Sequence, residues 1–413
     1  MKACGIIVEY NPFHNGHSYH LQQSKKQTES DIIVAVMSGN FLQRGEPAIL
    51  SKWDRTRTAL MGGADLVIEL PYLFAVSPAP VFAQSSVILL NEMGVDAVCF
   101  GSESGNMDTF YHTISELEKQ KTLYDDSFRS YIKQGHSYPK ASSLAAGALS
   151  LGDQALDLSK PNNILGIEYV KSILSHQFPI RPETIKRIGA AYHDDQITAH
   201  KIASATAIRK TLLESEKIDI TMIDEAVPGY TRDILIKHLK ESGTFTTWEN
   251  LYPLLRYKLL SSTPEQLREL YETEEGLEHR LRSVITGANH FHEFMSALKT
   301  KRYTWTRLQR MCLHILHNVN KRAAAEWISQ KPPYIRILGM SDEGQQYLKT
   351  RKNEVNVPIV STVSQHNHPM LELEQRVSSI YYAGYPQSVL TKKIKEEYST
   401  PPLRYDRSRG LFQ

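Results

Sequence analysis

The sequence predicts an α/β protein whose N-terminal half is a Rossmann-like, doubly wound parallel sheet. Short runs of apolar and β-branched residues alternate with longer helical stretches, which is the order followed by parallel strands and their crossover helices. Glycine, proline or asparagine follows each apolar run, as expected where a strand turns into a loop. The five predicted strands are Ala3–Val8, Asp31–Met37, Ala64–Leu70, Val95–Phe100 and Arg181–Ile188.

Helices are predicted between these strands. Residues 21–30 form the polar remainder of a first helix, and Ser51 is a typical N-cap for a second helix that runs to Gly62. A third helix covers Gln84–Met93, and residues 105–155 are helical and polar. Because ligands bind beyond the carboxyl ends of the strands in such sheets, the segments that follow the strands are the candidates for a functional site.

The turn after the first strand has the features of a phosphate-binding site. Asn11-Pro12 ends the strand, and His14-Asn15-Gly16-His17 follows where a helix begins. Free backbone N–H groups and the helix dipole favour an anion at such a position, and two histidines three residues apart on a helix lie close together. The simpler alternative is that His14 and His17 are surface residues on a loop. The strand, the proline turn and the spacing together favour nucleotide binding.

This pattern resembles the HxGH signature of the nucleotidylyltransferase superfamily. In that group the two histidines bind phosphates and stabilise charge in the transition state, while no residue attacks phosphorus. Its members also carry an ISSTxxR-like stretch after the last strand. Ser204, Thr206 and Arg209 match that stretch, whereas Ala203 and Ala205 depart from it. Hydroxyl groups at a helix start, with an arginine one turn later, suit a second phosphate-binding element.

The segment after residue 215 is predicted to be helical and basic. Helical patterns occur at 221–241, 247–260, 264–272, 276–297 and 304–328. From Phe294 to Ala325 there is no acidic residue, whereas seven lysines and arginines are present with aromatic residues among them. This stretch is either a solvated helix face or a surface for an RNA backbone with stacking aromatics. The candidate RNA-contacting residues are Lys299, Lys301, Arg302, Tyr303, Trp305, Arg307 and Arg310.

The C-terminal segment is predicted to be a small α/β subdomain with a tail. Strand-like runs at Tyr334–Leu338 and Val357–Val360 flank a helix at 342–352, and a last helix spans 371–384. The tail from Tyr398 to Gln413 is rich in proline and arginine and is expected to be extended.

The chain has 413 residues, which allows one large domain or two to three ordinary ones. It has no apolar run long enough to cross a membrane and no signal-peptide layout, so we expect a cytoplasmic protein. Cys4, Cys99 and Cys312 are its only cysteines, which fits a reducing compartment. The expected units are a nucleotidyltransferase-like ATP-binding catalytic domain at 1–215, a helical, basic region at 216–330, and the C-terminal subdomain and tail at 331–413.

The charge is distributed unevenly along the chain. Residues 1–200 carry 17 Lys+Arg and 21 Asp+Glu, a balance of −4, whereas residues 201–413 carry 31 and 24, a balance of +7. A polyanion would therefore contact the C-terminal half. The histidine pairs have no third ligand at usable spacing, so no metal-binding residue is predicted. These pairs are His290/His292, His314/His317 and His366/His368.

Several longer stretches match a narrower family. They are Gly5–His20, Ser38–Pro47, Lys52-Trp53-x-Arg55, Gly62–Pro71, Phe100–Glu103, Pro161–Gly166 and Arg187 ahead of Gly189. These stretches look like those of the bacterial tRNA(Met) cytidine acetate ligases, and the likeness spans nearly the whole chain. It implies an HxGH-type fold and a two-step reaction. ATP and acetate give acetyl-adenylate and pyrophosphate, and the acetyl group then passes to N4 of the wobble cytidine of elongator tRNA(Met).

The resemblance also implies which residues act. His14 and His17 would hold the phosphates, and Lys52 or Arg55 could steady the pyrophosphate; we therefore count Lys52 with the catalytic residues. ATP chemistry implies Mg²⁺ as well, and a homodimer stays an open alternative. The residues expected to bind ATP are Ile7, Val8, Glu9, Tyr10, Asn11, Pro12, Phe13, His14, Asn15, Gly16, His17, Ser18, Tyr19, His20, Gly101, Asn162, Arg187, Ser204, Thr206 and Arg209.

Two other functions remain open at this point. A small-molecule adenylyltransferase of cofactor biosynthesis would share the HxGH turn, but it needs only about the first half of the chain. An RNA-binding or ribosome-assembly protein with a decayed nucleotide site is disfavoured, because both predicted phosphate-binding elements keep their cationic or hydroxyl residues. The acetate pocket and the base that accepts the N4 proton are not identified by the sequence.

Overall fold

The computed structural model describes residues 1–136, 138–149, 152, 155–187, 203–214, 218–274 and 276–413. Within these residues the central element is one nine-stranded sheet in the order β5-β4-β1-β2-β3-β6-β8-β9, with β7 paired to β6. The strands are β1 Ala3–Val8, β2 Ile32–Ser38, β3 Leu66–Leu70, β4 Ala97–Ser102, β5 Arg181–Lys186, β6 Ile335–Ser341, β7 Ile359–Val360, β8 Leu403–Asp406 and β9 Leu411–Phe412.

The first five strands are parallel and confirm the predicted doubly wound sheet. β1 pairs with β2 on one side and with β4 on the other. The strand order therefore runs one way from β1 to β3 and the opposite way from β1 to β5, with the reversal between β1 and β4. Such a reversal leaves a crevice beyond the carboxyl ends of the two strands, where ligands bind. The predicted continuation of the fifth strand into Ile188 and Gly189, and the boundary at residue 215, lie outside the described residues.

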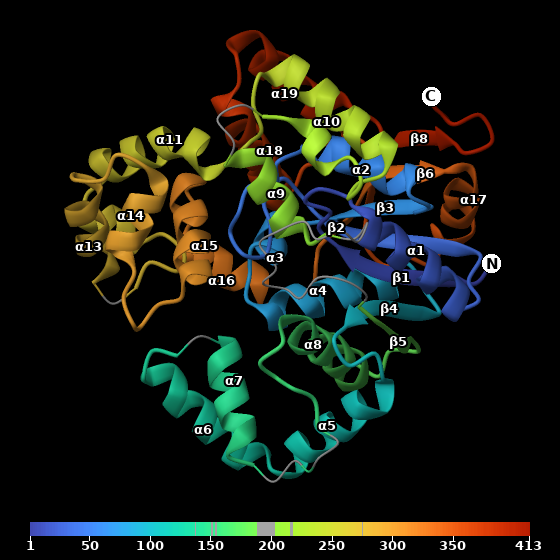
Figure 1. Ribbon diagram of the computed structural model, residues 1–413, viewed down its shortest axis with the longest axis horizontal. Helices are drawn as coiled ribbons and strands as arrows, with labels where there is room; N and C mark the ends of the chain where they lie inside the picture. Colours follow the sequence, from blue (N-terminus) through green and yellow to red (C-terminus); the bar gives the residue numbers. More distant parts are fainter. Residues whose placement is uncertain (137, 150–151, 153–154, 188–202, 215–217, 275) are drawn as a thin grey trace.

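Helices cover both faces of this sheet, which explains why its strands read as continuous apolar runs. In β2, Ile33, Ala35 and Met37 join the core beneath helices α1 and α2. The alternating residues Ile32, Val34 and Val36 join the core on the side of α4 and α8 (Figure 1). The bounds of these helices are α1 Asn15–Gln27, α2 Lys52–Met61, α4 Ala79–Glu92 and α8 Pro161–Ser175, and the short α3 spans Tyr72–Ala75.

The C-terminal strands extend the same sheet instead of building a sheet of their own. β6 pairs antiparallel with β3, and β8 continues beyond β6. Without β6, the backbone groups along one edge of β3 would be unpaired, which makes β3 a template for another strand. The predicted helix at 342–352 is α17 Asp342–Arg351, and the helix at 371–384 is α18 Pro369–Tyr381. Helix α19, Gln387–Ser399, was not predicted.

The region of 216–330 is helical, as predicted, but its longer patterns divide. The pattern at 276–297 is two helices separated near Gly287, and the pattern at 304–328 breaks at Asn318, whose φ is 52°. Asn320 then caps the next helix. The helices are α9 Ala205–Leu213, α10 Gly229–Ser242, α11 Trp248–Ser261, α12 Pro264–Arg268, α13 Leu277–Ile285, α14 Phe291–Leu298, α15 Trp305–Leu316 and α16 Lys321–Ile328.

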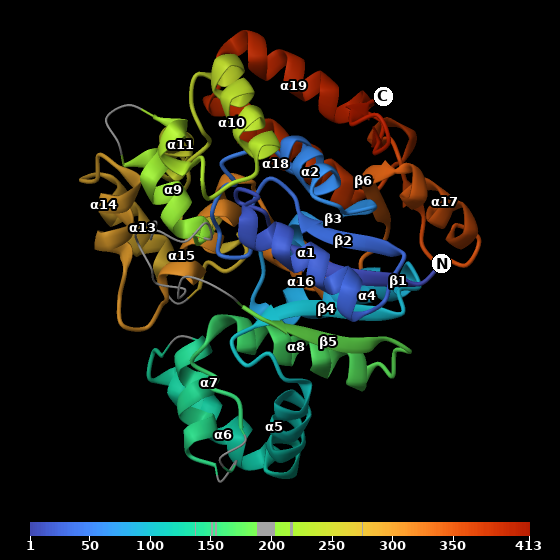
Figure 2. The ribbon, with the colours of Figure 1, turned by 45° about the vertical axis from the view of Figure 1, so that its right-hand side comes forward.

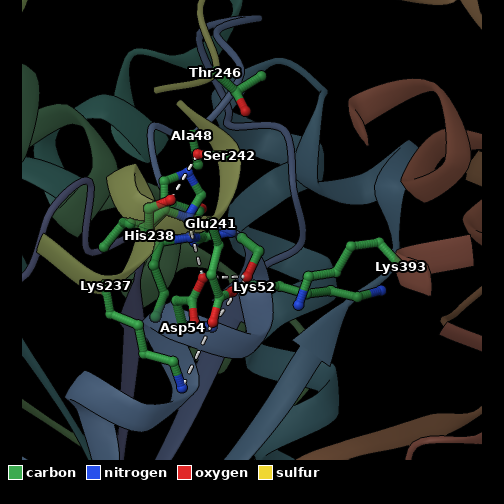
Figure 3. A network of polar contacts seen from close by, with 12 residues as sticks. Ala48, Lys52, Asp54, Lys237, His238, Glu241, Ser242, Thr246 and Lys393 are labelled. Atoms are coloured by element: carbon green, nitrogen blue, oxygen red, sulfur yellow. Dashed lines mark hydrogen bonds and ion pairs between the residues drawn. The ribbon is translucent and has the colours of Figure 1, made fainter. Parts of the chain in front are cut away.

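This helical region is packed onto the half of the chain that contains β1 to β5. Its apolar residues belong to the same continuous core as β2 and α4. Trp248 donates from its indole nitrogen to the carbonyl of Gly45 over 2.8 Å, which ties α11 to the loop after β2. Figure 3 shows a second link, in which His238 of α10 points to Asp54 of α2 with Nδ1 and Oδ2 3.4 Å apart.

A helical arm projects from the β4–β5 side of the sheet. It consists of α5 Met107–Lys119, α6 Lys121–Lys133 and α7 Tyr138–Gly147 (Figure 2). Its tip meets the helical region, because a Cβ on Gly135 would lie 2.7 Å from the carbonyl of Lys301 and the Cα of Arg302. Among the helices described, none has both the length and the apolar character that a membrane crossing requires.

Candidate functional site

The turn between β1 and α1 is shaped by the two histidines themselves. His14 is the N-cap of α1, and its Nδ1 accepts a hydrogen bond from the backbone N–H of Gly16 over 3.1 Å. His17 completes a capping box, because its Nδ1 accepts from the backbone N–H of His14 over 3.3 Å. The two rings stack with their centroids 3.7 Å apart. The HxGH spacing therefore fixes both rings side by side at the start of a helix.

These hydrogen bonds determine what the histidines can do. A neutral imidazole has one N–H donor and one acceptor nitrogen, and here each Nδ1 is the acceptor, so each Nε2 carries the proton. Burial and the nearby Arg187 and Arg209 lower the pKa of His14 to about 3, and burial with the neighbouring His14 lowers the pKa of His17 as well. Both rings are therefore neutral near pH 7. Each offers one Nε2–H that can donate to an anion.

The rest of the turn is held rigidly by its neighbours. Tyr10 has a φ of 51°, which is rare for an aromatic residue, and its ring packs on Phe13 at 4.7 Å and on His17 at 4.8 Å. Asn11 accepts from the backbone N–H of Ile49 over 2.9 Å. Val8, Tyr10, Asn11, Pro12, Phe13 and His14 are buried, whereas Ile7, Glu9, Asn15, Gly16, His17, Ser18, Tyr19 and His20 are half-buried.

Two arginines from distant segments reach this turn. Arg209, in α9, donates to the backbone carbonyl of Asn11 over 2.9 Å and pairs with Glu46 at 3.1 Å. Arg187, directly after β5, is exposed and lies 3.5 Å from the side-chain oxygen of Asn162. The structure thus brings Arg187 and Arg209 to the same turn as the histidines. The positive charges of both arginines help to lower the pKa of His14.

The end of β4 forms the opposite side of the crevice. A Cβ on Gly101 would lie 3.4 Å from Cγ of Arg187 and 4.0 Å from Cδ2 of His20, so these three positions are neighbours. Glu103 accepts from the side chain of Asn162 over 2.7 Å and from the backbone N–H of Asn163 over 2.9 Å. Gly101 and Asn162 therefore lie in the crevice with the HxGH turn, although they are 61 positions apart in the sequence.

The second predicted phosphate element is a capped helix. Ser204 is the N-cap of α9 and accepts from the backbone N–H of Ala207 over 3.0 Å. Thr206 is exposed in the first turn of the helix. Ser204 therefore stabilises the helix start, while Arg209 is the residue of this stretch that reaches the HxGH turn.

We expected Lys52 or Arg55 to steady the pyrophosphate, and the structure corrects this expectation. The charged groups of both residues are bound inside the protein. Lys52 is fully buried, with Nζ 2.8 Å from Glu69 and 2.7 Å from Glu397. Arg55 is also fully buried and donates to the backbone carbonyls of Glu9 and Ser38 over 2.7 and 3.1 Å. Both cations already have their partners inside the protein, so steadying pyrophosphate would require breaking these contacts.

Sequence reasoning missed the buried ionic cluster to which Lys52 belongs. Arg336 of β6 lies 3.0 Å from Glu69 of β3 and 2.8 Å from Glu397 of α19. Burial alone raises the pKa of Glu397, but Arg336 and Lys52 outweigh it and lower the pKa to about 2. The sequence does contain one sign of this cluster, which is Glu69 within the apolar strand Leu66–Leu70. A fully buried carboxylate there needs an opposite charge beside it.

The candidate RNA-contacting residues separate into two groups. Tyr303 is buried in the core and Arg310 is buried beside Glu272 at 3.4 Å, which corrects their assignment as stacking and phosphate-contacting residues. Arg307 pairs with Glu274 at 3.4 Å, and its guanidinium lies 4.7 Å from the centre of the Tyr303 ring. Lys301 and Arg302 are exposed, whereas Lys299 and Trp305 are half-buried. The acidic partners, Glu272 and Glu274, precede the acid-free stretch in the sequence, so the composition of 294–325 gives no sign of them.

Comparison with known proteins agrees with this geometry. A model of the HIGH nucleotidyl transferase family matches residues 1–397. A curated tRNA(Met) cytidine acetate ligase of Halalkalibacterium halodurans is 46% identical, with 98% of each chain covered. Another of the same name, from Bacillus subtilis, is 45% identical and covers 100% of this chain and 99% of its own. The chain belongs to the tRNA(Met) cytidine acetate ligase family of HIGH nucleotidyl transferases.

Solved structures in this ligase family have the same fold. A crystal structure of Thermotoga maritima TmcAL without ligand superposes with a TM-score of 0.87 at 31% identity. A second one, bound with alpha-thio ATP, superposes with a TM-score of 0.85 at the same identity. Each alignment covers 98% of this chain and 99% of the other. The family resemblance therefore extends through the helical region and the C-terminal strands, beyond the HxGH half.

Proposed function

We propose that this protein is an ATP-dependent ligase that activates acetate as acetyl-adenylate and transfers the acetyl group to N4 of the wobble cytidine of elongator tRNA(Met). The observation that carries the proposal is the pair of neutral histidines at the start of α1, which present two Nε2–H donors beside Arg187 and Arg209. Donors and cations held in this way suit the phosphates of ATP.

In the first step an acetate oxygen attacks the α-phosphorus of ATP, and the bond to the β,γ-phosphates breaks. Negative charge then grows on the departing pyrophosphate, and the Nε2–H groups of His14 and His17 stabilise it without any proton having to move. Arg187 and Arg209 add positive charge beside the same crevice. Gly101 and Asn162 line the opposite side, where ATP would lie across the β1–β4 crevice.

Mg²⁺ would supply further charge neutralisation on the phosphates. In the part of the chain that the structure describes, no three His, Cys, Asp or Glu side chains gather in a way that could hold a metal ion. The roles given above to histidine and arginine side chains do not depend on one.

The extent of the family match favours the ligase over a small-molecule adenylyltransferase. The relatives named tRNA(Met) cytidine acetate ligase align with 98–100% of this chain, including the helical region that a cofactor enzyme would not need. A ligase of this kind would work in the cytoplasm, where its tRNA is.

The test is incubation of the protein with ATP, labelled acetate and bulk tRNA, followed by digestion of the RNA to nucleosides. We expect label in N4-acetylcytidine only when all three substrates are present, with AMP and pyrophosphate as the other products. Label in a small dinucleotide, or acetylation of RNA without ATP, would rule the proposal out.

A further inference from the structure

A carboxylate just ahead of the HxGH turn is assigned no role in the proposed adenylation step. Glu9 follows β1 directly and stands five residues before His14. One of its oxygens, Oε1, accepts from the backbone N–H of Gln43 over 2.8 Å and from the hydroxyl of Ser38 over 3.3 Å. The other oxygen, Oε2, accepts no hydrogen bond from the described residues, and the residue as a whole is half-buried. The hydrogen bonds to Oε1 thus orient the Glu9 side chain, and Oε2 can accept a hydrogen bond from a substrate.

Acetyl transfer needs a proton acceptor, because the amino group of cytidine must lose a proton when it becomes an amide. His14 and His17 cannot take this role. Each Nδ1 lone pair is used by a backbone N–H, and each Nε2 already carries a proton. Burial raises the pKa of Tyr10 and Tyr169, so their hydroxyl groups stay protonated. With these four side chains excluded, we consider the carboxylates as the proton acceptor.

Four glutamates belong to strands β1 to β4 or to the loops that directly follow them, and three of them are already engaged. Glu46 pairs with Arg209, and Glu69 is buried between Lys52 and Arg336. Both oxygens of Glu103 accept hydrogen bonds, from Asn162 and Asn163. Glu46 keeps Oε1 without a partner among the described residues as well, but its other oxygen is bound to Arg209. Glu9 is therefore the one of the four that is neither paired with a lysine or arginine nor hydrogen-bonded through both oxygens among the described residues.

We propose that Glu9 receives the N4 amino group of the acceptor cytidine, first as a hydrogen-bond acceptor and then as the base that takes its proton. In the transfer step, N4 bonds to the acetyl carbon and the bond from that carbon to the phosphate oxygen breaks. The electron pair leaves with AMP, and the N4 proton moves to Oε2 of Glu9. This inference rests on the proposed function, since it assigns the second half of the same reaction.

The surroundings of Glu9 suit both roles. Burial and the nearby negative charge of Glu46 raise the pKa of Glu9, while the Gln43 N–H and the charges of Arg44 and Arg55 oppose the rise, and the net effect is a pKa above the ordinary value. A carboxylate also accepts from the N4 amine of cytosine, whereas uracil presents an oxygen at the same place. Glu9 would therefore favour cytidine over uridine in addition to removing the proton.

The test compares two half-reactions in the full-length protein. Acetate-dependent ATP–pyrophosphate exchange measures activation, and single-turnover chase of bound acetyl-adenylate with elongator tRNA(Met) measures transfer. Glu9→Gln keeps an oxygen for Gln43 and Ser38 but has no second acceptor. We expect it to lower the ratio of transfer to exchange by about a hundredfold, the usual size of general-base catalysis. Glu9→Asp, which keeps a carboxylate, should recover at least a tenth of the wild-type ratio.

The pH profile and base preference give independent readouts. Wild-type transfer should rise with pH through one ionisation, and this rise should vanish in Glu9→Gln. The preference for an anticodon-loop RNA with cytidine over one with uridine should fall at least tenfold in the variant. An unchanged ratio, or an equal loss of both half-reactions in a folded variant, would overturn the assignment of Glu9. Absence of acetate-dependent exchange in the wild type would instead refute the proposed function itself.

Discussion

At the scale of single residues, the histidines of the HxGH turn have two connected tasks. Their Nδ1 atoms accept the backbone N–H groups that a helix start leaves unpaired, and this fixes the protons on Nε2. The same bonds that build the helix start therefore set the tautomer that an anion site needs. The low pKa of both rings follows from burial and neighbouring positive charge, so the donors persist across the physiological pH range.

Replacing His17 should therefore impair chemistry more than folding. His17→Ala removes one Nε2–H donor, and loss of such a donor costs about 3–4 kcal/mol in the transition state. We expect acetate-dependent ATP–pyrophosphate exchange to fall by a hundredfold or more, with a loss of about 1 kcal/mol in stability from the missing cap. His279→Ala, at an exposed position of α13, is the matched control. Near-normal exchange by folded His17→Ala would remove the residue from the mechanism.

The buried histidines also predict how stability depends on pH. The folded-state pKa is about 3 for His14 and for His314, well below the ordinary value of 6.5, chiefly because of burial. The unfolded chain then binds more protons between these values, so the free energy of unfolding falls as pH drops from 6.5 toward 3. Each such group contributes a slope of up to about 1.4 kcal/mol per pH unit.

His314→Phe should make this slope shallower by about one proton, whatever its effect on stability at pH 7. The measurement is urea unfolding of both proteins at several pH values between 4 and 7. Equal slopes would mean that His314 is protonated in the folded protein, contrary to its buried position beside Tyr72 and Tyr271.

At the scale of elements, buried ion pairs attach the C-terminal strand β6 and helix α19 to α2 and β3. Lys52 of α2, Glu69 of β3, Arg336 of β6 and Glu397 of α19 form one buried cluster. A Cβ on Gly39 would approach the Glu69 carboxylate to 2.7 Å, so the loop after β2 is fitted around this cluster as well. The segment that follows the helical region therefore returns to complete the sheet and to lock α2 in place.

Lys52→Met should act on stability and not on chemistry. Removing one member of a buried ion cluster leaves uncompensated charge and typically costs about 3–5 kcal/mol. Lys119→Met removes an exposed ion pair with Glu116 and should cost less than about 1 kcal/mol. Thermal unfolding compares the two variants, and exchange activity per folded molecule should stay near the wild-type value. A stable but inactive Lys52→Met protein would restore Lys52 to the catalytic residues.

The sequence predicted those features whose signal is local. The strand–turn–helix pattern, the HxGH spacing and the Ser204 cap each depend on neighbouring residues, and the structure confirms their placement. The roles of Lys52, Tyr303 and Arg310 were misjudged because burial and partners come from segments far away in the chain, such as Glu397 and Glu272. The pairing of β6 with β3 was also not predicted, because the residues around a strand do not indicate which distant strand pairs with it.

At the scale of the whole molecule, the helical region and the crevice are in direct contact. Gly45 has a φ of 81°, and a Cβ there would lie 2.5 Å from the backbone nitrogen of Arg310, so the loop after β2 is pressed against α15. That loop also supplies Gln43, which orients Glu9. The exposed Lys301 and Arg302 lie just before α15, against the tip of the helical arm. A tRNA held at this loop would thus rest on elements that border the crevice.

Charge reversal at this loop tests the RNA surface. Lys301→Glu with Arg302→Glu should weaken tRNA binding and reduce its log–log salt slope by about 1.4–1.8, at 0.7–0.9 per lost phosphate contact. Exchange without tRNA should persist. The matched control is Lys349→Glu with Lys352→Glu, two exposed lysines at α17, which lies across the molecule from α13 to α15 (Figure 1). Equal weakening in both variants would mean that the effect is general electrostatics and would place no RNA contact at the loop.

The oxygen atoms of acetate show directly whether acetate is activated as acetyl-adenylate. The protein is incubated with ATP, tRNA and acetate labelled with ¹⁸O in both oxygens, and the released AMP is examined by mass spectrometry. If acetate attacks the α-phosphorus and the acetyl group then leaves for N4 of cytidine, each AMP formed with N4-acetylcytidine must carry one ¹⁸O. Unlabelled AMP, or ADP and phosphate as products, would contradict activation through acetyl-adenylate.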